Sequence, residues 1–184
     1  MDFIDIIKPP RPIPCGLSMG GAITQQLLIN YKNSFHAGIL INTGARLKVM
    51  PLIFETIKKK YSDFVDMLCA FAISPNSDAE KLRARIEACS QCQPDIALGD
   101  FRACDSFNVM KELSLIKVPI LILTANDDNI TPHTYGTFLE KNIKNAKLVN
   151  IEDAGHFSPI EKSHKVNKAI RDFLAQTLLQ SNEL

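Results

Sequence analysis

The first residues with a chemical signature are Gly16-Leu17-Ser18-Met19-Gly20, a Gly-x-Ser-x-Gly pattern. They follow the apolar run Ile13-Pro14-Cys15 and open a helix-like pattern over residues 21–29. A strand, a sharp turn and a helix in this order hold a serine hydroxyl above the end of the strand, where it can act as a nucleophile. We expect both glycines to be needed, because side chains two positions before and after the serine would collide with the neighbouring strand and helix. The pentapeptide by itself fits an ordinary glycine-rich turn with an incidental serine equally well.

The residue after the serine fits the same chemistry. If Ser18 attacks a carbonyl carbon, the carbonyl oxygen becomes negative. The backbone N–H of Met19 would lie at the N-terminus of the helix, where N–H groups and the helix dipole stabilise a negative charge. Met19 is therefore the predicted oxyanion-hole donor.

A serine hydroxyl needs a base to take its proton, and the base needs an acid to orient it. The apolar run 118–124 ends at Asp127 and Asp128, and a second run, 147–151, leads to His156. Each of these residues follows a predicted strand, as Ser18 does, and the carboxyl ends of parallel strands share one edge of a sheet. The spacing leaves both aspartates open as the acid. His133 is the one rival base, and we expect it to be a helix-start residue instead.

With these stretches the chain resembles the α/β-hydrolase family, and more narrowly its bacterial esterase, lactonase and perhydrolase-like branch with a helical cap. The acid pattern of that family, Gly-x-x-Asp-x-x-Thr-Pro, falls on residues 125–132 with Ala125 in place of the glycine, so the resemblance implies Asp128 as the acid. Some members place the acid after the preceding strand, but here the run 37–41 is followed by Asn42-Thr43-Gly44 without a carboxylate. The resemblance implies a Ser18–His156–Asp128 triad that cleaves a carboxylic ester or lactone, with no cofactor and no metal.

The expected fold is α/β: a partial α/β-hydrolase fold with a mostly parallel sheet of the later strands, helices on its faces, and a helical cap inserted before the strand that carries the acid. We expect residues 1–44 to hold the elbow and the next strand, residues 45–116 the cap, and residues 117–184 the rest of the core. A helix end over residues 3–7 and a connector, Pro9-Pro10-Arg11-Pro12, precede the elbow strand.

Members of the family carry several strands and a helix before the elbow strand, and these supply the second oxyanion-hole donor. The sequence is therefore expected to be N-terminally truncated, with Met1 as an internal methionine. We expect the isolated chain to be weakly active or inactive. We also expect it to associate with a second copy through the exposed edge of the elbow strand.

Substrate contacts are predicted from the cap and from the residue after the histidine. The apolar side chains there either line an acyl pocket or form the core of the cap itself. The segment Ser77-Asp78-Ala79-Glu80 has the pattern of a capping box that opens a cap helix. The predicted substrate-binding residues are Met67, Leu68, Phe71, Phe107 and Phe157.

Composition favours a cytoplasmic protein that acts on a small molecule. Its 21 Lys and Arg residues nearly balance 20 Asp and Glu residues, which argues against nucleic acid or a membrane surface as partner. No apolar run approaches the roughly 20 residues that span a bilayer. Five cysteines are an odd number for a disulfide framework. Cys89 and Cys92 form a lone Cys-x-x-Cys without further zinc ligands. We expect Cys15, Cys69 and Cys104 to be buried as small apolar residues.

Two alternatives to ester or lactone hydrolysis remain open. The same triad also supports perhydrolysis or carbon–carbon bond cleavage, and the triad residues do not distinguish these reactions. Alternatively, the chain is a catalytically inactive fragment or pseudoenzyme that acts as an interaction module.

Overall fold

The computed structural model describes residues 2–10 and 12–181. Arg11, which belongs to the predicted connector, and Met1 therefore lie outside the described residues. Four parallel strands form one sheet in the order β1-β2-β3-β4. The mostly parallel sheet expected from the sequence is confirmed. The strands are β1 (Cys15–Leu17), β2 (Gly38–Ile41), β3 (Ile120–Ala125) and β4 (Ala146–Ile151).

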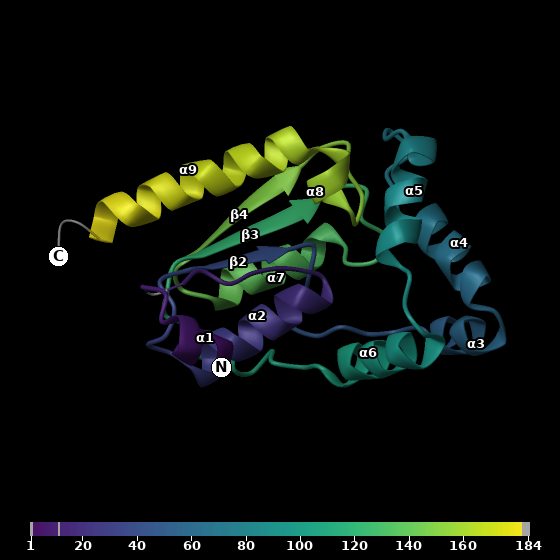
Figure 1. Ribbon diagram of the computed structural model, residues 1–184. Coiled ribbons are helices and arrows are strands. Elements are labelled where there is room, and N and C mark those ends of the chain that lie inside the picture. The colour runs from purple at the N-terminus through teal and green to yellow at the C-terminus, as the bar shows by residue number, and fades with distance from the viewer. Residues whose placement is uncertain (1, 11, 182–184) are drawn as a thin grey trace.

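Helices cover both faces of this sheet. Figure 1 shows α9 along one face and α2 with α7 along the other. Helices α2 and α7 each connect consecutive strands, as parallel pairing requires. Apart from four α-helices that follow β2 and are described below, the helical elements are α1 (Asp2–Ile7), α2 (Met19–Asn30), the 3₁₀ helix η1 (Leu113–Leu115) just before β3, α7 (His133–Asn142), α8 (Ser158–Glu161) and α9 (Ser163–Ser181).

Strand β3 is central and is buried on both faces. Its side chains alternate: Ile120 and Ile122 belong to the apolar cluster under α2 and α7, whereas Leu121 and Leu123 belong to the cluster under α9. A continuous apolar run is what a parallel strand covered on both sides requires. The sheet is thereby held rigidly between its helices, and the carboxyl ends of all four strands emerge at the same edge.

Four α-helices lie between β2 and η1, and Figure 1 shows them beyond the carboxyl ends of the strands. We call them the cap helices. They have an apolar cluster of their own. Where the chain enters and leaves them, Arg46 and Asn108 form an antiparallel bridge. The domain division at residues 44 and 116 stays a prediction. The cap helices are α3 (Pro51–Lys59), α4 (Tyr61–Ala72), α5 (Ala79–Cys89) and α6 (Pro94–Ser106).

The predicted capping box at Ser77 is wrong. Asp78 is the N-cap of α5, and its side chain accepts a hydrogen bond from the Lys81 N–H at 3.1 Å. The hydroxyl of Ser77 instead donates to the carboxylate of Glu161 at 2.8 Å. The Ser77 hydroxyl is thus engaged by a residue 84 positions away, and the next residue caps the helix.

The prediction for Cys15 is also wrong: its side chain is exposed, because β1 lies at one end of the sheet. Cys69 and Cys104 are buried, as expected. Cys89 and Cys92 are exposed free thiols, and the Tyr61 hydroxyl lies 3.0 Å from Cys92 Sγ. Within the described residues, no helix combines the length and the apolar character needed to cross a membrane.

Candidate active site

Ser18 occupies a strained turn between β1 and α2. Its backbone has φ 52° and ψ −114°, with a positive φ that a non-glycine residue rarely adopts. Such a conformation costs about 1–3 kcal/mol and persists only where the surroundings enforce it. Here the Ser18 N–H donates to the Ile41 carbonyl at 2.9 Å, and the Thr43 hydroxyl donates to the Ser18 carbonyl at 2.8 Å. The end of the neighbouring strand therefore holds the turn in place.

The glycines of the turn do not have equal roles. A side chain on Gly16 would place Cβ 2.0 Å from the carbonyl oxygen of Gly20, so no other residue fits. A Cβ on Gly20 meets nothing within 4 Å, so the expected collision at that position is wrong. The close approach lies one residue later, where a Cβ on Gly21 would lie 2.5 Å from the Thr43 methyl group. The helix turns Gly20 away from the sheet and Gly21 toward it.

Two alanine substitutions test this difference. Gly16→Ala should lower the free energy of unfolding by about 3 kcal/mol, because the clash is with backbone atoms that cannot rotate away. Gly20→Ala should change it by no more than about 1 kcal/mol, because alanine favours a helix and the space is open. Urea unfolding of both variants beside the parent chain measures the difference. Equal losses would mean that both positions need glycine after all.

Asp128 and His156 form a buried pair at the carboxyl ends of β3 and β4. His156 Nδ1 lies 2.9 Å from Asp128 Oδ2, and the two side chains are 5% and 0% exposed. The hydroxyl of Thr131 donates to the same Oδ2 at 2.7 Å and lies 3.2 Å from His156 Nδ1. The other oxygen, Oδ1, accepts the N–H groups of Ile130 and Thr131 at 2.9 Å each. The carboxylate is therefore held in one orientation toward the imidazole.

These contacts determine the ionisation of the acid. Burial by itself raises the pKa of the Asp128 carboxyl, but the hydrogen bond with His156 and those from Thr131 outweigh it, and the pKa lies below its ordinary value. Asp128 is thus a carboxylate at neutral pH. A buried negative charge at this position can orient an imidazole and stabilise its protonated form.

Asp127 and His133, the alternative acid and the alternative base, make other contacts. Asp127 accepts hydrogen bonds from Ser74 Oγ at 2.5 Å and Asn126 Nδ2 at 2.8 Å. His133 is the first residue of α7, as expected, and its Nδ1 lies 2.8 Å from the hydroxyl of Thr124. Of the two adjacent aspartates, Asp128 is the one that contacts His156.

Asn42 joins the end of β2 to the loop that carries His156 (residues 152–157, the histidine loop), a role that no sequence signal indicated beyond its position after β2. It is fully buried with φ 43°. Its amide nitrogen, Nδ2, donates to the carbonyl oxygens of Gly155 and His156 at 3.0 and 2.8 Å, and to Ser158 Oγ at 3.2 Å. Its own N–H donates to the Leu123 carbonyl at 2.8 Å. One side chain at the end of β2 therefore holds the backbone that carries the histidine.

Ser18 lies at the same sheet edge, at the end of β1. Among the described residues, the structure contains no hydrogen bond between its hydroxyl and His156, whose ring contacts Asp128 and Thr131. Such contacts are often long in an empty site and shorten when a substrate binds. Met19 is the first residue of α2, so its N–H has no acceptor within the helix. Its role as oxyanion donor stays a prediction.

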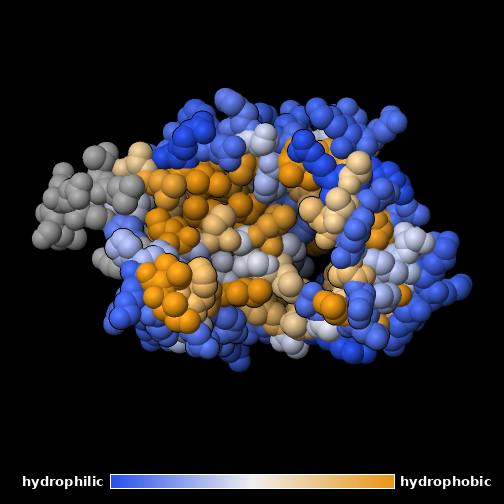
Figure 2. Space-filling model, viewed as in Figure 1, coloured by the Kyte–Doolittle hydropathy of each residue, from blue (hydrophilic) through white to orange (hydrophobic). Residues whose placement is uncertain are grey.

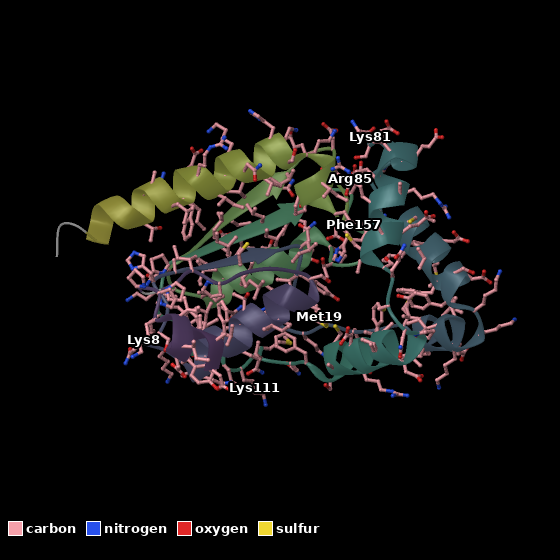
Figure 3. All side chains as sticks on the ribbon, viewed as in Figure 1. Lys8, Met19, Lys81, Arg85, Lys111 and Phe157 are labelled. Carbon is pink, nitrogen blue, oxygen red and sulfur yellow. The ribbon has the colours of Figure 1, made fainter. Side chains whose placement is uncertain are left out.

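Figure 2 shows the surface hollowed between the sheet-bearing part of the molecule and the cap helices. In Figure 3, Met19 and Phe157 lie on the side of the core that faces these helices. Phe157 packs against the cluster of α4 and α5, and Phe107 shares a cluster with Met19. The three cap residues Met67, Leu68 and Phe71 divide: the first two pack in the clusters of the cap helices, while Phe71 is 56% exposed. The acyl pocket stays a prediction.

No group of three or more His, Cys, Asp or Glu residues that could hold a metal ion occurs within residues 2–10 and 12–181. The polar groups at this edge are a hydroxyl, an imidazole, a carboxylate and backbone N–H groups. Such a set can transfer an acyl group through the serine oxygen.

The chain is similar to known hydrolases along most of its length. The family model described as "TAP-like protein" matches residues 100–183. A solved thermophilic esterase shares 32% sequence identity at a TM-score of 0.79, and the match covers 91% of this chain and 67% of the esterase. The chain belongs to the α/β-hydrolase family. Its relatives include esterases and lactonases, and the expected family, fold class and assignment as an enzyme are therefore confirmed.

Two further proteins are similar to most of the chain at lower sequence identity. A putative non-heme bromoperoxidase, BpoC of Mycobacterium tuberculosis, is 24% identical over 92% of this chain and 69% of its own length. The crystal structure of the enol-lactonase of Burkholderia xenovorans LB400 has the same fold, with a TM-score of 0.86 and 24% identity over 94% of this chain and 69% of that one. This α/β-hydrolase chain thus spans about two thirds of the length of each relative.

Proposed function

We propose that this chain carries the nucleophile, base and acid of a serine hydrolase that cleaves carboxylic esters or lactones. The observation that carries the proposal is the strained Ser18 turn at the same sheet edge as the buried Asp128–His156 pair. A serine in an ordinary glycine-rich turn does not need a strained backbone. The similar proteins include an esterase and an enol-lactonase, which fit this substrate class.

In the proposed reaction, the Ser18 oxygen attacks the carbonyl carbon of the ester while His156 takes the hydroxyl proton. The Met19 N–H stabilises the negative oxygen of the tetrahedral intermediate. His156 then gives the proton to the leaving alcohol oxygen as the carbon–oxygen bond breaks. The same imidazole then takes a proton from water, and the water oxygen attacks the acyl carbon. His156 returns the proton to the Ser18 oxygen as the acyl–oxygen bond breaks and the acid is released. Asp128 holds the ring and balances its positive charge throughout.

A fluorophosphonate probe tests this assignment in the chain as it is. The phosphorus reacts with an activated serine, fluoride leaves, and intact mass reports one added group. We expect one label per chain, located by peptide mass on Ser18 and absent in Ser18→Ala. A folded chain that takes no label, or a label that persists in the variant, would overturn the proposal. Such an outcome would favour the alternative of an inactive fragment that serves as an interaction module.

The proposed partner is therefore a small ester or lactone. Perhydrolysis and carbon–carbon cleavage use the same residues, and the bromoperoxidase name of one relative keeps the first of these as an alternative. A panel of esters, lactones and a peracid assay distinguishes them. Weak turnover by the isolated chain and a cytoplasmic location both stay predictions.

We also propose that the isolated chain associates through β1, whose outer edge has no partner strand among the described residues. Figure 2 shows apolar residues gathered beside α9, over the strands. Unpaired N–H and C=O groups next to an apolar surface favour pairing with a second copy. Light scattering in reducing buffer should show a dimer whose fraction rises with concentration and falls in Cys15→Lys, because the exposed Cys15 lies on that edge. A monomer at every concentration would contradict the proposal.

A further inference from the structure

The last residue of α4 and the segment between α4 and α5 contact the two loops that carry His156 and Asp128. The His156 N–H donates to the Ala72 carbonyl at 2.7 Å. The Ser74 hydroxyl donates to Asp127, the residue before the proposed acid, at 2.5 Å. We call residues 73–78 the cap linker. The cap helices are thus tied directly to the backbone that carries the base and the acid.

The carboxylate of Glu161 lies at the centre of this junction. Its Oε2 accepts the Ser74 N–H at 2.9 Å and the Ser77 hydroxyl at 2.8 Å. The Gly155 N–H donates to the same carboxylate, 3.0 Å from Oε2 and 3.1 Å from Oε1. Hydrogen bonds to a charged acceptor are about twice as strong as those between neutral groups. One side chain at the end of α8 therefore holds the cap linker and the residue before His156 together.

The backbone around Gly155 lies very close to the backbone at the end of α4 and in the cap linker. A Cβ on Gly155 would lie 2.3 Å from the Ala72 carbonyl oxygen and 2.7 Å from the Ser74 nitrogen. Only a glycine lets the histidine loop meet the cap linker at this distance. Phe157, the next residue after the histidine, packs against the apolar cluster of α4 and α5. The histidine is thus flanked on both sides by residues that contact the cap helices.

We propose that Glu161 is a positioning residue that couples the seating of the cap helices to the placement of His156 beside Asp128. This inference rests on the proposed function. Without the carboxylate, the three donors from the cap linker and the histidine loop lose their common acceptor, and the two backbones can separate. The His156 ring would then move relative to Ser18, and we expect this displacement to lower the rate of the chemical step more than it weakens substrate binding.

The test compares Glu161→Ala with Glu161→Gln. A misplacement of about 1 Å at a catalytic group can cost about 100-fold in rate. We expect Glu161→Ala to lower kcat and the rate of fluorophosphonate labelling by about 10- to 100-fold, with KM changed by less than about 3-fold. Glu161→Gln keeps one acceptor oxygen and should recover much of the loss. Glu152→Ala removes an exposed carboxylate from the loop before His156 and should leave the rate unchanged.

Coupling through the cap linker is measured with Ser77→Ala, a milder variant that removes one donor to Glu161. If both residues act through the same contact, the double variant Ser77→Ala/Glu161→Ala should lose as much kcat as Glu161→Ala alone. Losses that multiply would overturn the proposal. So would an unchanged labelling rate in Glu161→Ala.

Hydrogen exchange gives a readout that does not depend on catalysis. In Glu161→Ala, the amides of residues 73–77 and of Gly155 and His156 should exchange faster together, and Ser18→Ala should leave them unchanged. If the parent chain takes no fluorophosphonate label, the proposed function fails, yet this exchange result still tests the coupling. Unchanged exchange in Glu161→Ala would overturn the coupling even if Ser18 is labelled.

Discussion

Replacing Ser18 with alanine is expected to lower the kcat for a p-nitrophenyl ester by more than about 10⁴-fold. Removal of a triad serine costs about 10⁶-fold in an efficient enzyme, and the starting rate of this chain sets how much of that range is seen. The physical reason is that alanine has no hydroxyl. The base then has no nucleophile to deprotonate, and the acyl-serine intermediate cannot form.

The control for this variant is Ser114→Ala, which removes an exposed hydroxyl from η1 and should leave kcat unchanged. Alanine at the nucleophile position meets the same backbone strain as the serine it replaces, so the free energy of unfolding should change by less than about 1 kcal/mol. Urea unfolding checks this. Ester hydrolysis that persists in a folded Ser18→Ala chain would mean that a different residue is the nucleophile.

Replacing Asp128 with asparagine is the second largest effect, an expected fall in kcat of about 10⁴-fold. The carboxylate now accepts the imidazole Nδ1–H at 2.9 Å, which leaves the opposite ring nitrogen free to take the serine proton. The amide of asparagine can donate instead, and the imidazole would then hold its proton on the wrong nitrogen. Steady-state kinetics on the best ester of the panel measures the loss.

Asp127→Asn is the matched comparison, because the two aspartates are adjacent and chemically identical. Asp127 contacts Ser74 of the cap linker and not the imidazole, so its loss should be far smaller than that of Asp128→Asn. A larger loss at Asp127 than at Asp128 would reverse the assignment of the acid. Unfolding curves of both variants separate a kinetic effect from a loss of fold.

The sequence by itself determined the parts of this protein that depend on local pattern. Gly16, Ser18 and the helix after them form a turn that short-range sterics dictate. The apolar runs that became β3 and β4 place polar residues directly after each strand, and parallel strands bring those residues to one edge. The candidate serine, acid loop and histidine could therefore be predicted before any tertiary contact was known.

The family pattern implied Asp128 rather than Asp127, but the directions in which adjacent residues point depended on tertiary structure. Asp127 and Asp128 occupy the same loop, and only the hydrogen bonds with Thr131 and His156 turn the second one toward the ring. The same holds for Gly20 and Gly21, which the helix directs away from and toward Thr43. Neighbours in sequence share composition and pattern, so pattern cannot distinguish the directions in which they point.

Contacts between distant segments were beyond the sequence for a different reason. Ser77 and Glu161 are 84 residues apart, and Asn42 and His156 are 114 apart. Ser77 has the pattern of a helix cap, and Glu161 belongs to a helix of four residues, so each has a sufficient local explanation. Their meeting depends on how the cap helices seat on the sheet, which the packing of many apolar side chains decides at once and no single motif records.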